Sequence, residues 1–336
     1  MLQPVESAAT RGDAAVLGRH RVAVLIPCYN EESTIADVVA AFRAALPAAA
    51  VHVYDNNSTD RTVAAARAAG AIVRREAHQG KGHVVRRMFA DIEADIYVLV
   101  DGDATYDAPS AHALIVRLIE DRLDMVVGSR VERAPAAYRP GHRAGNRLLS
   151  GFVAAVFGHA FTDMLSGYRV FTRRFVKSFP LLSGGFEIET ELTVHALELG
   201  LPVAEVPTPY YSRPQGSAAK LNTWRDGLRI LWTIARLYKS ERPQPFFAAI
   251  GGMLALAAVV LAVPIFATYL REGTVPRLPT AVLATGLMLL AFLSLTCGMV
   301  LGTVTRGRRE IKVLAYLNQR ALETDDGGQT PDDGNG

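Results

Sequence analysis

Two long apolar stretches near the C-terminus restrict what this chain can fold into more than any other feature. Residues 246–270 read FFAAIGGMLALAAVVLAVPIFATYL, and residues 280–304 read TAVLATGLMLLAFLSLTCGMVLGTV, with no Asp, Glu, Lys or Arg in either. Each is longer than the roughly 20 apolar residues that cross a bilayer as a helix. A buried core helix is the alternative for such a stretch, but two side by side favour a transmembrane hairpin within residues 244–306.

The charges that flank the two stretches predict their orientation. The connecting loop, REGTVPRLP, has two basic residues, whereas more lie outside the hairpin: Arg236, Lys239, Arg242, Arg306, Arg308, Arg309 and Lys312. Because cytoplasmic flanks carry the excess of Lys and Arg, both ends of the hairpin should lie in the cytoplasm. We therefore expect an integral protein of the cytoplasmic membrane, with the soluble part and both termini cytoplasmic and with no signal peptide.

The ends of the chain and its overall charge add less. Residues 1–19 are predicted to be a disordered leader, and residues 307–336 a partly disordered cytoplasmic tail with an acidic end. The two cysteines, Cys28 and Cys297, are far apart in sequence and indicate neither a disulfide framework nor a metal cluster. The net charge is +3, and we expect no nucleic-acid partner.

Residues 20–222 alternate between apolar runs of strand length and segments with helical spacing. Strands are expected at 21–27, 51–55, 71–76, 95–100 and 124–130, of which the first and the fourth read as buried. Helices are expected between them, with Ser33 as the N-cap of the first helix. This alternation predicts an α/β domain with a mostly parallel sheet and helices on both faces.

Polar clusters follow four of these strands: PCYNEE, DNNSTD, DGDATYD and GSR. They should converge, because open α/β sheets bind ligands at the carboxyl ends of their strands. Asp101 and Asp103 suit a divalent cation held on a substrate phosphate, although Asp-Gly-Asp is also ordinary turn sequence. Lys81, in GKG without a Walker A pattern, either lies in a close-approach turn or contacts a phosphate. With Arg130, these residues suit a nucleotide with a metal-bound diphosphate.

Residues 223–243 have the pattern of an amphipathic helix at the membrane surface. Four basic residues fall within an arc of about 80° at roughly 100° per residue: Arg225, Arg229, Arg236 and Lys239. The rest of the segment is mostly apolar and includes Trp224 and Trp232. The pattern is typical of a helix in the headgroup layer, with a solvated charged face on a core helix as the alternative.

Several motifs together resemble the inverting glycosyltransferases of family 2, which have a GT-A fold. They are VLIPCYNE, DNNSTDRT, VDGD, VVGSR, DMLSGYRVF, FEIETEL and EVPTPYYSRPQGSAAKL, followed by the C-terminal hairpin. The polyprenyl-phosphate glycosyltransferases of dolichyl-phosphate mannose synthase type are the branch that the chain resembles most. The resemblance covers about residues 20–240.

This resemblance implies roles on the donor side. The nucleotide-sugar would be bound by Pro27, Tyr29, Glu31, Asp55, Asn57 and Lys81. Asp101 and Asp103 match the D-x-D motif that binds Mg²⁺ or Mn²⁺, with Asp103 as the principal ligand. Thr105 stands where those synthases commonly have a third ligand, Gln. Glu189 would be an acid beside the sugar, with a helix start or a strand face as the structural alternative.

The resemblance also implies an acceptor side. Phosphate contacts would come from Arg130, Asn146, Ser150, Arg213, Ser217 and Lys220, with Ser217 replacing the serine that the family has before Lys220. Helix packing and a turn are the alternative for the segments 145–151 and 163–171. Asp163 and Arg169 could equally form a structural ion pair.

The function implied is metal-dependent, inverting transfer of a sugar from a nucleoside diphosphate, UDP or GDP, to a dolichyl, undecaprenyl or decaprenyl phosphate. A lipid phosphate is already an anion and needs no general base. Three alternatives stay open: a tethered enzyme with another lipid or polysaccharide acceptor, a processive synthase, although no Q-x-x-R-W motif is present, and a non-catalytic nucleotide-sugar-binding scaffold. A homo-oligomer is also open, because Gly251, Gly252, Gly298 and Gly302 would allow close helix packing.

Overall fold

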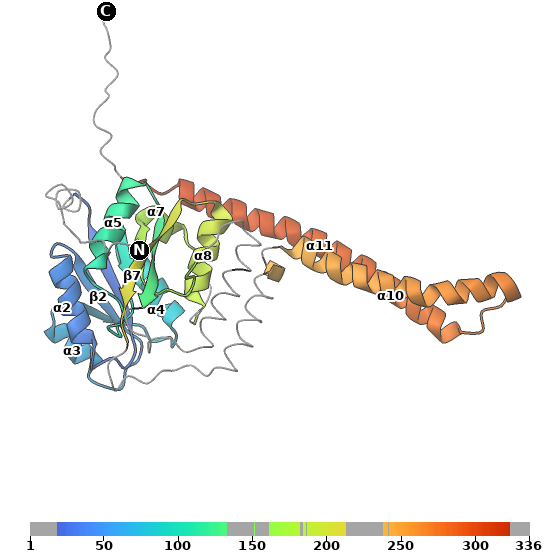
Figure 1. Cartoon of the computed structure of the whole chain (residues 1–336), viewed down its shortest axis with the longest axis horizontal. Helices are drawn as coiled ribbons and strands as arrows, with labels where there is room; N and C mark the ends of the chain where they lie inside the picture. Colours follow the sequence, from blue (N-terminus) through green and yellow to red (C-terminus); the bar gives the residue numbers. More distant parts are fainter. Residues whose placement is uncertain are drawn as a thin grey trace, which may run out of the picture. The chain divides into compact units, whose positions relative to one another are not determined.

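The computed structural model of the chain describes residues 19–132, 151, 161–181, 184–185, 187–212, 238–240 and 242–322 (Figure 1). These residues form two compact units. The first is built by the chain up to Gly227 and again from Lys312 onward, and the second is Leu228–Ile311. Most of the leader, residues 223–237 of the expected interfacial helix and the end of the tail lie outside the described residues.

The first unit is organised by a seven-stranded sheet in the part of the chain that the structure describes. Its order is β3-β2-β1-β4-β6-β5-β7. The strands are β1 (Val22–Cys28), β2 (Ala50–Asp55), β3 (Ile72–Arg75), β4 (Ile96–Leu99), β5 (Met125–Glu132), β6 (Arg169–Thr172) and β7 (Val203–Tyr210). β6 is antiparallel to β4 and β5, and the other neighbours are parallel, which confirms the predicted mostly parallel sheet.

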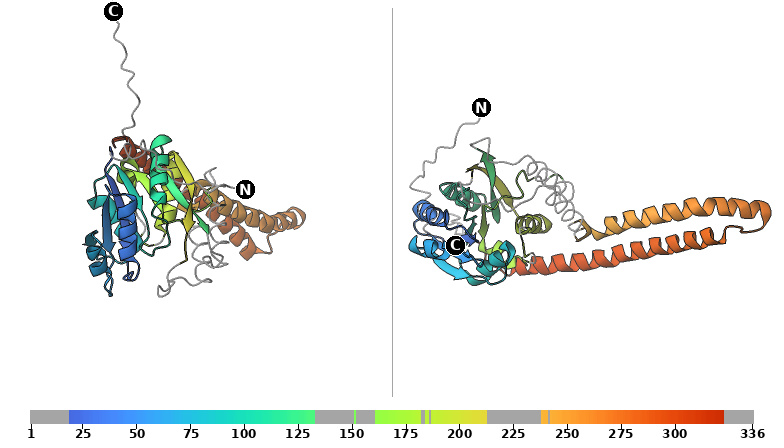
Figure 2. Two further views of the ribbon diagram at one scale, coloured as in Figure 1. Left: turned by 60° about the vertical axis from the view of Figure 1, so that its left-hand side comes forward. Right: turned by 90° about the horizontal axis from the view of Figure 1, so that it is seen from below.

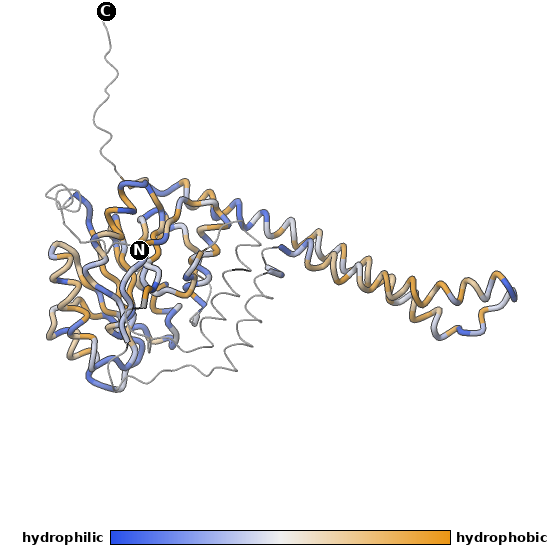
Figure 3. Tube along the Cα trace, viewed as in Figure 1, coloured by the Kyte–Doolittle hydropathy of each residue, from blue (hydrophilic) through white to orange (hydrophobic). Residues whose placement is uncertain are grey.

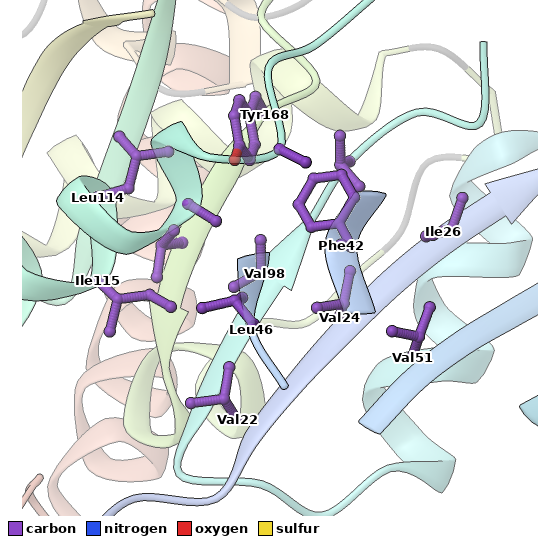
Figure 4. Close-up of a cluster of buried hydrophobic side chains, with 14 of the residues drawn as sticks. Val22, Val24, Ile26, Phe42, Leu46, Val51, Val98, Leu114, Ile115 and Tyr168 are labelled. Atoms are coloured by element: carbon purple, nitrogen blue, oxygen red, sulfur yellow. The ribbon is translucent and has the colours of Figure 1, made fainter. Parts of the chain in front are cut away.

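Helices cover both faces of the sheet, as predicted. They are α2 (Ile35–Ala45), α3 (Thr62–Ala68), α4 (Lys81–Asp91), α5 (Ser110–Glu120), α7 (Arg173–Ser178) and α8 (Ile188–Leu199). On one face, α2 and α5 pack Phe42 and Leu114 against the strands in the apolar core that Figure 4 shows. On the other face, Phe89 of α4 meets Tyr97 and Phe171. β4 is buried on both sides, which explains its uninterrupted apolar sequence.

The start of α2 differs from the prediction. The helix begins at Ile35, so the N-cap position is Thr34 and not Ser33, and no side chain caps the helix. The Thr34 hydroxyl instead donates a hydrogen bond of 2.7 Å to the carbonyl oxygen of Gly102. The prediction of Ser33 as the N-cap was wrong, because the helix begins one residue later than expected. Local sequence does not reveal the long-range contact that the Thr34 hydroxyl makes. This contact links the first helix to the D-x-D segment.

The second unit is dominated by two helices, α10 (Pro243–Glu272) and α11 (Leu278–Leu317). Both are long and apolar enough to cross a membrane, and 11% of the most apolar window of each is buried. Figure 3 shows apolar residues along most of their length and polar residues at the connection. A core helix of a soluble protein would be mostly buried, so that alternative does not fit these two helices.

Small residues form the contact between α10 and α11, which lie side by side (Figure 2). Besides Pro243 in the first turn of α10, the buried positions are spaced by seven residues: Gly251 and Ala258 on α10, and Ala284, Ala291 and Gly298 on α11. A Cβ atom on Gly251 would lie 3.0 Å from the carbonyl oxygen of Ala291. Gly251 and Gly298 are therefore used within the hairpin, whereas Gly252 faces open space.

The C-terminal end of α11 belongs to the first unit. Lys312 forms an ion pair with Glu198 of α8, and the Tyr316 hydroxyl donates to the carboxylate of Asp124, which is fully buried. The Arg174 guanidinium lies over the Tyr316 ring, 4.3 Å from its centroid. The helix thus continues well past residue 304, and its last turns complete the packing of the sheet unit.

Candidate active site

Polar segments that follow β1 and β2 contact one another at the carboxyl edge of the sheet, as predicted. The backbone N–H of Thr59 donates to the side-chain oxygen of Asn30, and that of Glu31 donates to the Thr62 hydroxyl. Asp55, at the end of β2, is buried and accepts from the backbone N–H of Ser58. These contacts give the edge a defined shape before any ligand binds.

The other residues expected in the nucleotide pocket lie along the same edge. Pro27 is in β1, and Tyr29 and Glu31 follow that strand, all three partly exposed. Asn57 has a left-handed backbone, with φ 66°, and its side-chain oxygen accepts from Arg75 at 3.0 Å. The structure therefore brings the predicted nucleotide residues to one side of β1 and β2.

The D-x-D segment begins two residues after β4 ends. Asp103 is buried, and its Oδ1 accepts hydrogen bonds from the backbone N–H and the hydroxyl of Thr105, the latter at 2.6 Å. Two glycines allow close packing around it. A Cβ on Gly102 would lie 2.7 Å from the Cys28 sulfur, and one on Gly167 would lie 2.5 Å from Asp101 Oδ2. Thr105 therefore orients Asp103 in this structure.

Lys81 joins two carboxylates from distant parts of the chain. As the first residue of α4, it donates from Nζ to Asp101 Oδ1 and to Glu189 Oε1, both at 2.5 Å. Burial alone would lower the pKa of Lys81, but the charges of Asp101 and Glu189 outweigh burial and raise this pKa above its ordinary range. The FEIETEL segment is a helix start, and it directs Glu189 inward.

Arg130 forms the second charged cluster at this edge. Its Nε and Nη2 donate to the two oxygens of Asp163, both at 2.7 Å, and its backbone N–H donates to the same carboxylate. The guanidinium also lies 5.4 Å from the centroid of the Tyr210 ring. The suggested ion pair of Asp163 with Arg169 is wrong, because Asp163 pairs with Arg130. Arg169 instead donates to the carbonyl oxygens of Met164 and Ser166 and to the Thr193 hydroxyl.

Tyr106 was not singled out from the sequence, although it lies in DGDATYD. Its hydroxyl accepts a hydrogen bond of 2.8 Å from the backbone N–H of Gly167. Burial raises the pKa of Tyr106, with the charges of Arg130 and Asp101 acting in opposite directions. The Tyr106 ring lies 5.3 Å from the Tyr210 ring, centroid to centroid, which is the ring that Arg130 lies over. The position of Tyr106 among acidic turn residues was the available sequence signal.

The donor set fits a cation that is shared with a ligand. Within the described ranges, no group of three or more His, Cys, Asp and Glu side chains could hold a metal ion. Asp101 and Asp103 supply two carboxylates, and Mg²⁺ or Mn²⁺ is commonly held by one or two carboxylates together with substrate phosphates and water. The residues present thus fit such an ion bound with a diphosphate. The acceptor-side residues Asn146, Ser150, Arg213, Ser217 and Lys220 lie outside the described residues.

The chain resembles known proteins in sequence. The family profile described as "Glycosyl transferase family 2" matches residues 23–178. Glycosyltransferase AglJ of Haloferax volcanii is 39% identical over 250 residues, covering 74% of this chain and 81% of AglJ. The dolichyl-phosphate hexose transferase of the same organism is 28% identical over 66% of this chain and 95% of its own. The undecaprenyl-phosphate mannosyltransferase of Micrococcus luteus is 28% identical over 63% and 96%.

A solved structure supports the fold. Glucosyl-3-phosphoglycerate synthase of Mycobacterium tuberculosis, in complex with Mn²⁺, UDP-glucose and phosphoglyceric acid, superposes with a TM-score of 0.57. The match covers 70% of this chain and 86% of that one, at 23% sequence identity. At this identity the likeness concerns the fold of the sheet unit.

Proposed function

We propose a donor, an acceptor and a mechanism for this chain, which belongs to glycosyltransferase family 2 and is a glycosyltransferase. The donor is a nucleoside-diphosphate sugar, and the acceptor is a polyprenyl phosphate at the cytoplasmic face of the membrane. The observation that carries this proposal is the pair Asp101 and Asp103 at the carboxyl edge, beside Lys81 and Glu189. The names of the polyprenyl-phosphate relatives and the two apolar helices support a lipid acceptor.

On the donor side, Asp101 and Asp103 would hold Mg²⁺ or Mn²⁺ together with the diphosphate. When bound, the cation would neutralise the charge that develops on the departing diphosphate. Lys81 is a fixed positive charge at the same place, because both of its carboxylate partners hold it. We propose that Lys81 also faces the diphosphate and that Glu189 lies beside the sugar. The nucleotide would lie along Pro27, Tyr29, Glu31, Asp55 and Asn57.

On the acceptor side, the lipid phosphate would be met by Arg130, whose direction is set by its bidentate contact with Asp163. An oxygen of this phosphate attacks the anomeric carbon, forming the new C–O bond as the bond to the diphosphate oxygen breaks on the opposite side. The electron pair leaves with the nucleoside diphosphate, and the configuration inverts. No proton is transferred, so positioning and charge are what the site supplies.

The proposal is tested with labelled donors. Full-length protein in lipid receives UDP- and GDP-sugars, polyprenyl phosphate and Mg²⁺ or Mn²⁺, with chelator and the Asp103→Asn variant as controls. Label in an organic-extractable, mild-acid-labile product, absent in both controls, is the expected result and names the sugar. Metal-dependent donor hydrolysis without a lipid product would move the proposal to a different acceptor. Donor binding with neither activity would favour the scaffold alternative.

A further inference from the structure

Arg169, the first residue of β6, is a fully buried charge, and none of its hydrogen bonds to the described residues is to a carboxylate. It is the largest of the fully buried side chains in the described part of the chain. Its Nη2 donates to the carbonyl oxygen of Met164 at 2.6 Å, Nε to that of Ser166 at 3.0 Å, and Nη1 to the Thr193 hydroxyl at 2.8 Å. Burying a guanidinium without a bonded carboxylate costs free energy, so the hydrogen bonds that offset this cost show what the side chain holds in place.

The surrounding charges keep Arg169 ionised. Burial lowers the pKa of Arg169 to about 10, and the negative charges of Glu189 and Asp163 oppose that shift. At neutral pH the Arg169 side chain is therefore a cation, and it interacts electrostatically with the carboxylates of Glu189 and Asp163. Those carboxylates belong to different clusters, since Glu189 is paired with Lys81 and Asp163 with Arg130.

One side of the Arg169 contact fixes the segment 163–167. This segment begins with Asp163, which holds Arg130, and ends with Gly167, which packs directly against Asp101. Its middle is fastened to β5, because the Ser166 hydroxyl donates to the carbonyl oxygen of Gly128 at 2.6 Å. Two of the three oxygen atoms that Arg169 contacts are backbone carbonyl oxygens of this segment, so the guanidinium holds the backbone of residues 164 and 166 in place.

The other side of the contact reaches the helix that carries Glu189. Thr193 lies one turn after Glu189 in α8, and its hydroxyl donates to the Glu189 carbonyl oxygen at 3.0 Å while accepting from Arg169. The first turn of α8 is thereby tied to β6. The Arg169 side chain thus connects the segment 163–167, which contacts Arg130 and Asp101, with the first turn of α8, which carries Glu189.

We propose that Arg169 is a positioning residue that sets the separation between the Arg130–Asp163 pair and the Lys81–Glu189 pair. This inference rests on the proposed function, in which the first pair meets the attacking phosphate and the second meets the donor. In-line attack requires both substrates at a fixed spacing, and small displacements are costly in rate. Arg169 touches neither substrate and acts through the segment 163–167 and α8.

The test compares three variants with a matched control. Arg169→Met removes the hydrogen bonds of the guanidinium, and Arg169→Lys keeps the charge without the fork of donors. Thr193→Val removes the link to α8 together with the hydrogen bond from Thr193 to the Glu189 carbonyl oxygen. Arg174→Met is the control, because Arg174 lies on the next helix, α7, and pairs with the buried Asp124 instead. We expect Arg169→Met to lower kcat about 100-fold and Arg169→Lys about 10-fold, with donor KM changed less than kcat. The control should lose thermal stability with kcat unchanged.

Hydrogen exchange without substrate gives a second readout. Arg169→Met should exchange faster in both residues 161–168 and 187–193, and Thr193→Val only in the latter. If kcat tracks the loss of thermal stability equally in Arg169→Met and Arg174→Met, the positioning role is overturned. If wild type transfers no sugar to lipid phosphate, the proposed function fails by itself. The inference about Arg169 is then overturned if neither segment exchanges faster, and upheld as a link between the two clusters if both do.

Discussion

At the carboxyl edge of the sheet, neighbouring segments are joined by buried and half-buried charges, whereas in the hairpin they are joined by residues with almost no side chain. Lys81 brings together carboxylates from the segment after β4 and from α8, and Arg130 holds Asp163 through three hydrogen bonds. In the hairpin, Gly251 and Gly298 let the α10 and α11 backbones approach. A charge pair fixes one spatial arrangement, and the contact is lost when either partner is removed. A contact between small residues is kept as long as the side chains there stay small.

The largest effect should come from Asp103→Asn. The amide keeps an oxygen that can accept from Thr105, so the fold should be retained while the metal-binding carboxylate is lost. We expect transfer to fall by about 10³-fold, because a bound cation contributes several kcal/mol to the transition state. Steady-state transfer rates measure this effect. A variant that kept more than a tenth of wild-type kcat would remove Asp103 from the proposed mechanism.

Lys81→Met should damage the same edge in a different way. It leaves Asp101 and Glu189 as neighbouring carboxylates without their shared cation, which costs about 3 kcal/mol of unfolding free energy. A divalent cation can replace that charge, so Mn²⁺ without donor should raise the melting temperature of Lys81→Met more than that of wild type. Thermal unfolding with and without Mn²⁺ measures this. Equal shifts in the two proteins would contradict the prediction.

A matched pair of substitutions tests the hairpin. Leu at Gly251 would meet the Ala291 carbonyl and Leu295, whereas the position of Gly252 is open. Gly251→Leu should therefore lower the unfolding free energy by about 2 kcal/mol through overpacking, with Gly252→Leu close to wild type. Denaturation in detergent micelles measures both. Since both residues belong to the second unit and the charged edge belongs to the first, kcat of the folded fraction should not change, and a large loss would break the contrast drawn above.

His195 tests how a buried polar group without a partner behaves beside the paired ones. Neither ring nitrogen has a hydrogen-bond partner among the described residues, and the ring packs against Phe175 and Phe179. Burial, with a smaller contribution from the Lys312 charge, lowers the pKa of His195 to about 3 from 6.5. The unfolded chain therefore binds the proton more readily, so stability falls as pH falls below about 6.5.

Between about pH 7.5 and pH 5, this histidine should remove about 2 kcal/mol of unfolding free energy. The substitution His195→Leu should abolish that part of the pH dependence and leave the protein more stable than wild type at pH 5. Urea denaturation at several pH values gives both curves. Parallel curves for the two proteins would show that His195 is protonated, or finds a partner, in the folded state.

The first five strands were predictable because each begins with apolar residues in a run of strand length, and the first four are followed by a helical pattern. Two strands were missed. β6 has four residues and begins with Arg169, and β7 contains Pro207 and Pro209, which argue against a strand in any local pattern. Both strands are set by pairing with β5, so their own sequence carries only a weak signal.

Several residues of the candidate site were predictable from the sequence, but their pairings were not. Turn sequences after the strands revealed Asp55, Asp101 and Asp103, since parallel strands bring their carboxyl ends to one edge. That Lys81 bonds Glu189, across 108 positions of sequence, and that Arg130 bonds Asp163 across 33, depends on tertiary packing. No periodicity or motif spacing encodes such contacts.

The return of α11 to the sheet unit has a consequence for the order in which the protein is made. Lys312, Tyr316 and Leu322 contact α8, Asp124 and the apolar core, yet they are synthesised after both apolar helices. The first unit therefore gains these contacts only after the ribosome has synthesised both helices of the hairpin. A nascent chain stalled before residue 312 would contain the D-x-D segment and the segments after β1 and β2. It would lack the contacts that Lys312, Tyr316 and Leu322 make. Completion of the first unit therefore depends on translation of both apolar helices, which lie between its two parts in the sequence.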